Sequence, residues 1–249
     1  MSKSGNAAAQ DKESNLKIRP DRLLDVLVVG FPAGPWQTNC WVVAPDAGEE
    51  CIVIDPGHGA EGPLDDVLAQ HKLKPVAVLL SHGHIDHIWS VVPVCGAKNV
   101  PALIHPADRP MLTDPGSAVG APPGTPIMGR LDWSEPDDVR ELADGDQLTL
   151  AGLSLQVDLT PGHTPGSITF LTDGELFSGD LLFAGSIGRV DFPGGSWEQM
   201  QDSLRRVPLA LPDETVVRPG HGPDTTIGRE RATNPFLLDL MTAPPARGL

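Results

Sequence analysis

Apolar residues in this chain occur in short runs separated by turns, a pattern typical of a protein built on β-strands. The alternation is strictest from Leu153 to Leu159, where leucine or valine stands at every second position and polar residues lie between. Such alternation predicts a strand with one buried face. Other apolar runs predict strands at 24–29, within 31–44, at 51–55 and 76–80, within 101–108, and at 167–171, 175–178 and 215–217.

Helical periodicity marks two segments, Leu64–Gln70 and Trp197–Val207, in which apolar residues recur on one face. A helix is also expected directly after His87, where Pro93 predicts a kink or an early stop. A short helix from about Arg229 and the apolar segment that follows it close the chain. Strands and helices are thus mixed along the sequence, which indicates the α/β (α+β) class.

Two segments differ in composition from these elements. Residues 1–20 are small, polar and charged, and we expect a disordered tail there, ahead of a single domain over residues 21–249. Residues 113–138 are rich in glycine and proline, which predicts a long surface loop. This loop is a candidate lid over a pocket; a variable insertion without a role is the alternative.

Composition argues against several classes of partner. The net charge of −15 repels phosphate backbones, so no nucleic-acid partner is expected. No secretory signal is visible and no apolar run approaches the roughly 18 residues that cross a bilayer, so we expect a cytoplasmic protein without a membrane partner. Cys40, Cys51 and Cys95 form no CxxC pair and are expected to be small buried thiols.

The densest chemistry is the run S-H-G-H-I-D-H at residues 81–87, which directly follows a predicted buried strand. His82 and His84 point to the same side if the strand geometry continues, because extended side chains alternate. Asp86 and His87 are neighbours and must diverge, which suits two metal ions better than one. Imidazole and carboxylate are ligands that zinc, iron and manganese share.

Three further residues, His163, Asp180 and His221, each follow a predicted strand in a turn bounded by glycine. Loops at one edge of a sheet converge, so we expect these side chains to meet the first cluster. The seven ligands fill two metal sites if one carboxylate bridges. Asp55, at the end of another strand, is a candidate to hold a ligand histidine or its loop in place; capping of its own turn is the alternative. The remaining histidines lack ligand spacing: His58, His71 and His105.

The chain resembles the metallo-β-lactamase superfamily over nearly all of its length after residue 23. The resemblance lies in four motifs: H-x-H-x-D-H, T-P-G-H-T-P-G, S-G-D and P-G-H-G. The resemblance implies an αββα sandwich, two facing sheets with helices outside, and a metal pair at one edge. By the same analogy one metal takes three imidazoles and the other takes Asp86 with two imidazoles, with Asp180 bridging. The implied ligands are His82, His84 and His163 for the first ion, and Asp86, His87 and His221 for the second.

The segments 185–196 and 220–237 are most similar to single-domain, glyoxalase II-like hydrolases. This implies a hydrolase of thioesters, such as an S-2-hydroxyacyl thiol, in which a metal-bridging hydroxide attacks the carbonyl beside the catalytic Asp86. Zinc is the favoured metal, with iron or manganese as alternatives, and the partner is a small-molecule thioester or related acyl substrate. Arg189 and Asp191 lie in the first segment, where Arg189 binds a substrate carboxylate or the two form a structural pair.

Several alternatives stay open. A mononuclear-iron persulfide dioxygenase shares much of the pattern, a lactone or ester hydrolase uses the same attack on a carbonyl, and a non-catalytic metal-binding scaffold needs no substrate. Asp180 and His87 stand where β-lactamases of the commonest subclass carry cysteine and arginine, which disfavours antibiotic hydrolysis. The residues after His221 are too few for the helical domain with which glyoxalase II binds glutathione, so the thiol is open. The oligomeric state is open too.

Overall fold

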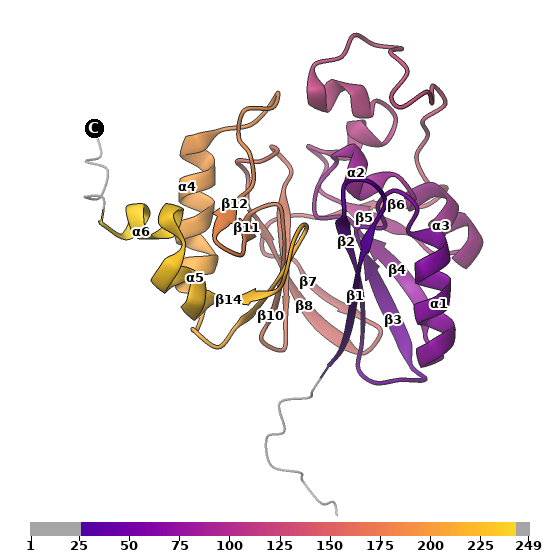
Figure 1. Ribbon diagram of the computed structural model, residues 1–249. Coiled ribbons are helices and arrows are strands. Elements are labelled where there is room, and N and C mark those ends of the chain that lie inside the picture. The colour runs from indigo at the N-terminus through magenta and orange to yellow at the C-terminus, as the bar shows by residue number, and fades with distance from the viewer. Residues whose placement is uncertain (1–25, 243–249) are drawn as a thin grey trace, which may run out of the picture.

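The computed structural model describes residues 26–242, and two six-stranded sheets form its centre (Figure 1). Strands β1 to β6 follow chain order across the first sheet, antiparallel up to β3 and parallel beyond it. Their bounds are β1 (Leu27–Ala33), β2 (Thr38–Ala44), β3 (Glu50–Ile54), β4 (Lys74–Leu79), β5 (Ala102–Ile104) and β6 (Val139–Glu141).

The second sheet has the order β14-β13-β10-β9-β8-β7, in which only β10 and β13 pair in parallel. A separate hairpin of two short strands, β11 (Leu182–Phe183) and β12 (Ser186–Ile187), follows β10. The bounds in the second sheet are β7 (Gln147–Leu150), β8 (Leu153–Leu159), β9 (Ile168–Thr172), β10 (Glu175–Gly179), β13 (Val216–Pro219) and β14 (Thr225–Thr226).

Helices cover the outer face of each sheet, which confirms the predicted αββα sandwich (Figure 1). The first sheet carries α1 (Glu61–His71) and α3 (Val91–Lys98) on its outside, and the second carries α4 (Trp197–Arg206), α5 (Ile227–Thr233) and α6 (Pro235–Thr242). Strand β2 shows why the layers form. Trp41 and Val43 pack between the sheets, whereas Val42 and Ala44 pack under the helices, as alternation along a strand requires.

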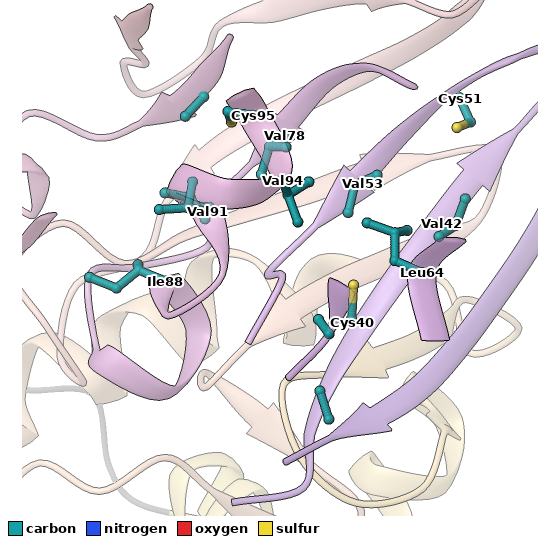
Figure 2. Packing of buried hydrophobic residues seen from close by; sticks show 14 of the residues in the cluster. Cys40, Val42, Cys51, Val53, Leu64, Val78, Ile88, Val91, Val94 and Cys95 are labelled. Atoms are coloured by element: carbon teal, nitrogen blue, oxygen red, sulfur yellow. The ribbon is translucent and has the colours of Figure 1, made fainter. Parts of the chain in front are cut away.

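The three cysteines lie in the outer core of the first sheet, Cys40 on β2, Cys51 on β3 and Cys95 on α3 (Figure 2). All three are free and buried, as expected. Burial raises the pKa of Cys51 and of Cys95 to about 12, and that of Cys40 well above its usual value. These thiols therefore stay protonated at neutral pH and act as small apolar side chains.

Some sequence expectations need correction. The first strand continues to Ala33, because β1 is an edge strand where Pro32 needs no ladder partner. The helix expected after His87 is two short helices, α2 (Ile85–Ile88) and α3, and Pro93 lies in the first turn of α3, where its missing N–H costs nothing. The strand predicted within 101–108 is only the three residues of β5, and a pair of 3₁₀ turns follows it, Arg109–Leu112 and Pro115–Val119.

The two-residue and three-residue strands β6, β11, β12 and β14 were missed, because such short elements carry no measurable periodicity. The predicted tail over residues 1–20 lies outside the described residues, and the single domain over residues 21–249 stays a prediction. In the part of the chain that the structure describes, no helix has both the length and the apolar character that crossing a membrane requires.

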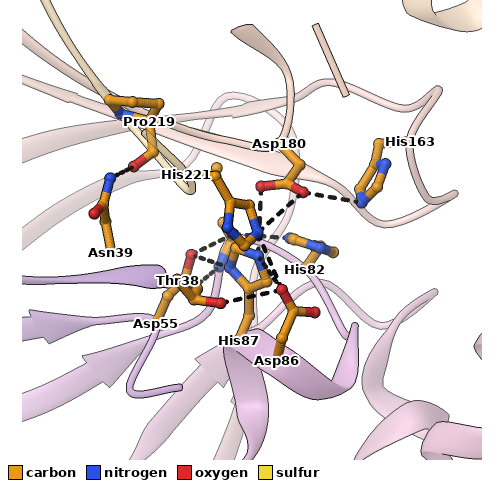
Figure 3. A network of polar contacts seen from close by, with 12 residues as sticks. Thr38, Asn39, Asp55, His82, Asp86, His87, His163, Asp180, Pro219 and His221 are labelled. Atoms are coloured by element: carbon orange, nitrogen blue, oxygen red, sulfur yellow. Dashed lines mark hydrogen bonds and ion pairs between the residues drawn. The ribbon is translucent and has the colours of Figure 1, made fainter. Parts of the chain in front are cut away.

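The two sheets are tied together at one edge, between the start of β2 and the end of β13. Asn39 donates from its side chain to the carbonyl oxygens of Pro219 (3.0 Å) and Gly222 (2.8 Å) (Figure 3). The indole N–H of Trp41 reaches the same Pro219 carbonyl at 3.1 Å. These bonds hold the loop that carries His221 against the first sheet, and the candidate site lies at this edge.

Candidate metal centre

The structure brings all seven predicted side chains to this edge, from loops of both sheets. Figure 3 labels all of them except His84. The turn after β4 and helix α2 contribute four of them: His82, His84, Asp86 and His87. The second sheet contributes three, each from a strand end: His163 after β8, Asp180 after β10 and His221 after β13. The convergence inferred from the loop positions is therefore observed, while their role as metal ligands stays a prediction.

Helix α2 contributes Asp86 and His87 to the site, whereas its last residue, Ile88, packs in the outer core of the first sheet. His84 is the residue before the helix and has extended backbone angles. The turn packs tightly, since a Cβ at Gly57 would lie 2.3 Å from the carbonyl oxygen of Asp86. Glycine at position 57 thus lets the third strand's turn approach the helix that carries Asp86 and His87.

Within residues 26–242, three groups of three side chains have the geometry to hold a metal ion. In each group, every side chain offers one ligand atom, and these three atoms lie within 4.8 Å of one another. The groups are His82–His84–His163, His82–His87–Asp180 and Asp86–His87–His221. The first and third match the two predicted ligand triads, and Asp180 stands between them. Its carboxylate oxygens lie 3.4 Å from Nε2 of His87 and 3.4 Å from Nε2 of His163.

The donor set fits metal ions on the evidence of its buried nitrogen atoms. Nε2 atoms of four buried imidazoles have no hydrogen-bond partner among the described residues, and neither has Oδ1 of Asp180. These imidazoles belong to His82, His84, His87 and His163. Buried polar atoms are almost always paired, so such a cluster is unusual unless the atoms bind something. Neutral imidazole and carboxylate are what zinc, iron and manganese accept.

Electrostatics divides the histidines of the metal-free protein into two kinds. Burial lowers the pKa of His82 well below its usual value, and burial with the neighbouring imidazoles lowers that of His84 to about 3. Burial alone would also lower the pKa of His87, but the carboxylates of Asp86, Asp180 and Asp55 outweigh it and raise the pKa well above its usual value.

The pKa of His221 is raised in the same way. Its burial opposes the shift, but hydrogen bonding to Asp86 (Nε2 to Oδ2, 3.0 Å) and the charge of Asp180 outweigh it. The two carboxylates respond in the opposite sense. Burial alone would raise the pKa of both carboxyl groups, but the nearby His87 and His221 lower the pKa of Asp86 and that of Asp180. Both aspartates are therefore ionised at neutral pH and can bind cations.

Asp55 contacts both the metal-binding turn and one of its histidines. Its carboxylate accepts hydrogen bonds from the N–H (2.7 Å) and the hydroxyl (2.5 Å) of Ser81, and Oδ2 lies 2.9 Å from Nδ1 of His87. With Nδ1 held in this way, Nε2 of His87 faces the centre. The sequence left open whether Asp55 holds a ligand or caps its own turn, and these contacts favour the first role.

Arg189 contributes through its backbone rather than its guanidinium. Its carbonyl oxygen lies 2.7 Å from Nδ1 of His163, an orientation that turns Nε2 to the centre. The guanidinium pairs with Asp191 at 2.9 and 2.8 Å, and both side chains are about two-thirds exposed. The structural pair considered from the sequence is therefore present. A backbone contact of this kind leaves no side-chain signal in the sequence.

Two buried carboxylates that sequence reasoning missed support the site. Asp108 is fully buried and accepts from Gly83 N–H (2.9 Å), Gly166 N–H (2.7 Å) and the hydroxyl of Thr164 (2.6 Å), so it joins the loops that carry His84 and His163. Its only sequence signal was a single acidic residue in the turn after β5, next to Arg109.

Glu230, also fully buried, holds the β11–β12 hairpin. It accepts from Gly185 N–H (2.7 Å), the hydroxyl of Thr225 (2.6 Å) and the side-chain amide of Asn234 (2.9 Å). Asn234 in turn donates to the carbonyl oxygen of Ser186 at 3.1 Å. Both residues belong to the segment 220–237 that carried the family resemblance, but nothing in that segment pointed to the hairpin.

A cavity of about 530 Å³ opens beside the centre, within the range of small-molecule sites. Residues of the 113–138 segment border it, among them Val119 and Ile127. The segment therefore lies over the site, while its movement as a lid stays a prediction. Within the described residues, the other histidines belong to none of the three ligand groups: His58, His71 and His105.

Comparison with known proteins gives one family and several relatives. The family described as the metallo-beta-lactamase superfamily matches residues 33–221. The chain is 46% identical over 223 residues to an uncharacterized protein of Mycobacterium tuberculosis, covering 86% of this chain and 99% of the relative. It is 32% identical over 217 residues to the hydroxyacylglutathione hydrolase GloC of Haemophilus influenzae, covering 83% and 96%.

Two solved structures are similar to this chain over most of its length. The BLEG-1 B3 metallo-beta-lactamase matches with a TM-score of 0.76 at 37% identity, covering 85% of this chain and 99% of that chain. TTHA1623, solved in a di-iron-bound form, matches with a TM-score of 0.71 at 41% identity, covering 85% and 100%. The similarity thus extends over almost the whole of the described region.

Proposed function

The chain belongs to the metallo-beta-lactamase superfamily, and on this premise we propose that it hydrolyses S-2-hydroxyacyl thioesters with a pair of divalent metal ions. The family match and the fold support a metal-dependent hydrolase and confirm the resemblance seen in the motifs. The observation that carries the proposal is the set of five imidazoles and two aspartates at one sheet edge, four of whose imidazoles present buried, unpaired Nε2 atoms.

In this proposal each triad holds one ion, and Asp180 lies between the two. His82, His84 and His163 would hold the first ion, and Asp86, His87 and His221 the second. The support is geometric, because each triad already brings its ligand atoms within 4.8 Å of one another. Zinc is the metal we favour, although imidazole and carboxylate suit iron and manganese as well. The di-iron form of TTHA1623 is the reason to test iron equally.

When bound, such ions lower the pKa of a water molecule towards neutrality and polarise a carbonyl oxygen. Asp86 would orient the attacking water, since its carboxylate is ionised and Oδ2 is steadied by the hydroxyl of Thr38 at 3.1 Å. Asp55 and the carbonyl of Arg189 keep the rings of His87 and His163 turned to the centre. A thiol product has a pKa of about 8.5, so no residue needs to protonate it as it leaves.

The choice of thioesters rests on similarity to GloC, whose name describes a hydroxyacylglutathione hydrolase. The test is hydrolysis of a panel of S-2-hydroxyacyl thioesters by purified protein. Chelation should abolish activity and added metal should restore it, and His82→Ala should lower the rate by orders of magnitude. Activity that survives complete metal removal would contradict the proposal. Oxygen uptake with a thiol persulfide in place of hydrolysis would favour the dioxygenase alternative.

A β-lactam hydrolase is a second candidate, favoured by one observation. The sequence argument against antibiotic hydrolysis concerned a subclass with cysteine and arginine at positions 180 and 87, whereas a B3 metallo-beta-lactamase matches this chain at 37% identity. A colour change of a chromogenic cephalosporin in the presence of the metal-loaded protein would detect this activity. Hydrolysis of thioesters without any β-lactam turnover would exclude it.

A further inference from the structure

The wall of the cavity beside the metal centre is mainly apolar, although its floor holds the candidate ligands. Apolar side chains reach it from separate segments of the chain. Trp36 comes from the turn between β1 and β2, Val119 and Ile127 from the long loop, Phe183 from β11, and Phe192 from the loop before α4. Five side chains from four segments are unlike the scattered single apolar residues of an ordinary surface.

Aromatic rings stand on both sides of the centre. The ring of Phe192 lies 5.4 Å from that of His84 and 6.5 Å from that of His163. On the other side, the ring of Phe183 lies 6.1 Å from that of His221. A bond cleaved at the centre therefore has apolar surface on both sides, for the acyl part of a substrate and for its leaving group.

Positive charge on this wall is sparse. Of the described residues that border the cavity, Arg189 is the only lysine or arginine. Its guanidinium is already paired with Asp191 and lies 4.3 Å from the centre of the Phe192 ring. Glutathione carries two carboxylates, and neither would meet an unpaired lysine or arginine among the described residues that border the cavity. The chain's net charge of −15 adds no attraction for anions.

We propose that the thiol part of the substrate is uncharged and apolar, an aryl or alkyl thiol rather than glutathione. The inference rests on the proposed thioester hydrolysis and specifies the substrate class for the same site. Apolar surface removed from water stabilises the complex in proportion to its area. A carboxylate buried without a partner costs free energy instead. Both effects favour the apolar thiol in this cavity.

The direct test compares the S-D-lactoyl thioesters of benzyl mercaptan and of glutathione on the metal-loaded protein. Each kcat/KM is divided by the hydroxide-catalysed rate constant of the same ester, which removes differences in intrinsic reactivity. We expect the benzyl ester to be preferred by about tenfold or more. An equal or higher value for the glutathione ester would overturn the inference and leave the proposed hydrolysis in place.

A matched pair of variants tests the cause. Val119 borders the cavity and is 54% exposed, whereas Leu131 lies on the same loop, is 64% exposed and does not border it. Val119→Lys supplies the missing cation and should raise the ratio of glutathione to benzyl ester hydrolysis several-fold. Leu131→Lys adds the same charge at a position that does not border the cavity and should leave the ratio unchanged. An unchanged ratio in Val119→Lys would contradict the argument from charge.

A binding experiment tests this inference even if the proposed hydrolysis fails. If no thioester is hydrolysed, the proposed function fails, and the cavity is then probed with inert thioethers by calorimetry. The 2-hydroxypropyl thioether of benzyl mercaptan should bind about tenfold or more tightly than that of glutathione. Equal affinities, or tighter binding of the glutathione compound, would overturn the inference independently of any activity.

Discussion

Oδ2 of Asp55 lies 2.9 Å from Nδ1 of His87, on the side of the ring opposite the Nε2 atom that faces the candidate metal centre. The same carboxylate accepts the N–H and the hydroxyl of Ser81, the first residue of the metal-binding turn. Asp55 has a positive φ of 51°, a conformation that aspartate adopts more readily than most residues. One buried carboxylate therefore fixes both the start of the turn and the orientation of a ligand.

Replacing Asp55 with asparagine should weaken metal binding by about 10- to 100-fold. The amide keeps one acceptor oxygen, but its NH₂ group would face a donor on Ser81 or His87. Competition with a chromogenic chelator measures the change. Asp158→Asn is the matched control, because Asp158 is also buried but bonds to Gln156 away from the centre. Wild-type affinity in Asp55→Asn would contradict a role in holding His87.

The ligand candidates could be predicted because their signals are local. His82 to His87 lie within six residues, and His163 and His221 follow apolar runs in glycine-bounded turns. The sandwich followed from family resemblance and from strands such as Leu153–Leu159, whose bounds the structure reproduces.

The supporting groups could not be predicted, since their partners are distant in sequence. Asp108 binds Gly83 and Gly166, and Glu230 binds Gly185, across gaps that no local pattern spans. The contact of His163 with a backbone carbonyl is invisible for another reason, because every residue has one. Short strands were missed because two or three residues carry no periodicity.

Metal uptake should release protons and strengthen as pH rises. In the metal-free protein, nearby carboxylates raise the pKa of His87, and the hydrogen bond to Asp86 with the charge of Asp180 raises that of His221, so both imidazoles keep their protons to a higher pH than an ordinary histidine does. A metal must displace these protons, so apparent affinity increases until pH passes the raised values. Lowered pKa values keep His82 and His84 neutral and ready to bind at pH 7.

Calorimetric titration in two buffers of different ionisation enthalpy measures the number of protons released at pH 7. His221→Ala removes one of the two candidate ligands whose pKa is raised and should release fewer protons. Affinity that is independent of pH between 6 and 8, with no proton release, would contradict the raised pKa values.

Gly220 should tolerate no side chain. A Cβ at this position would lie 2.2 Å from Oδ1 of Asp180 and 2.7 Å from Cε1 of His87. Gly220→Ala should therefore displace the carboxylate between the two triads and lower the bound metal below two ions per chain, as measured by elemental analysis. Gly96→Ala is the control, because its Cβ meets nothing within 4 Å in helix α3, where alanine should add about 0.5–1 kcal/mol of stability. Full metal content in Gly220→Ala would show that Asp180 is free to shift.

Asp108→Asn should destabilise the protein even without metal. The carboxylate satisfies two buried N–H groups and a hydroxyl, and leaving one buried donor unpaired costs about 1–3 kcal/mol. Urea denaturation of the metal-free protein isolates this cost from any loss of metal. A shift in midpoint no larger than that of an exposed variant such as Asp173→Asn would show that the loops do not depend on Asp108.

Glu230→Gln should change substrate binding without changing the metals. The Glu230 carboxylate joins Gly185 to Asn234, and so holds the hairpin from which Phe183 and Ile187 border the cavity. An amide loses one of the two acceptor oxygens, which loosens that wall but touches none of the seven candidate ligands. We therefore expect KM for the preferred thioester to rise about threefold to tenfold with kcat nearly constant, since an interaction that binds substrate and transition state equally acts on KM.

Metal content should stay at the wild-type value, and Glu214→Gln, at an exposed position, should behave like wild type. A lowered kcat with loss of metal and an unchanged KM would instead place the effect of Glu230 in the centre itself.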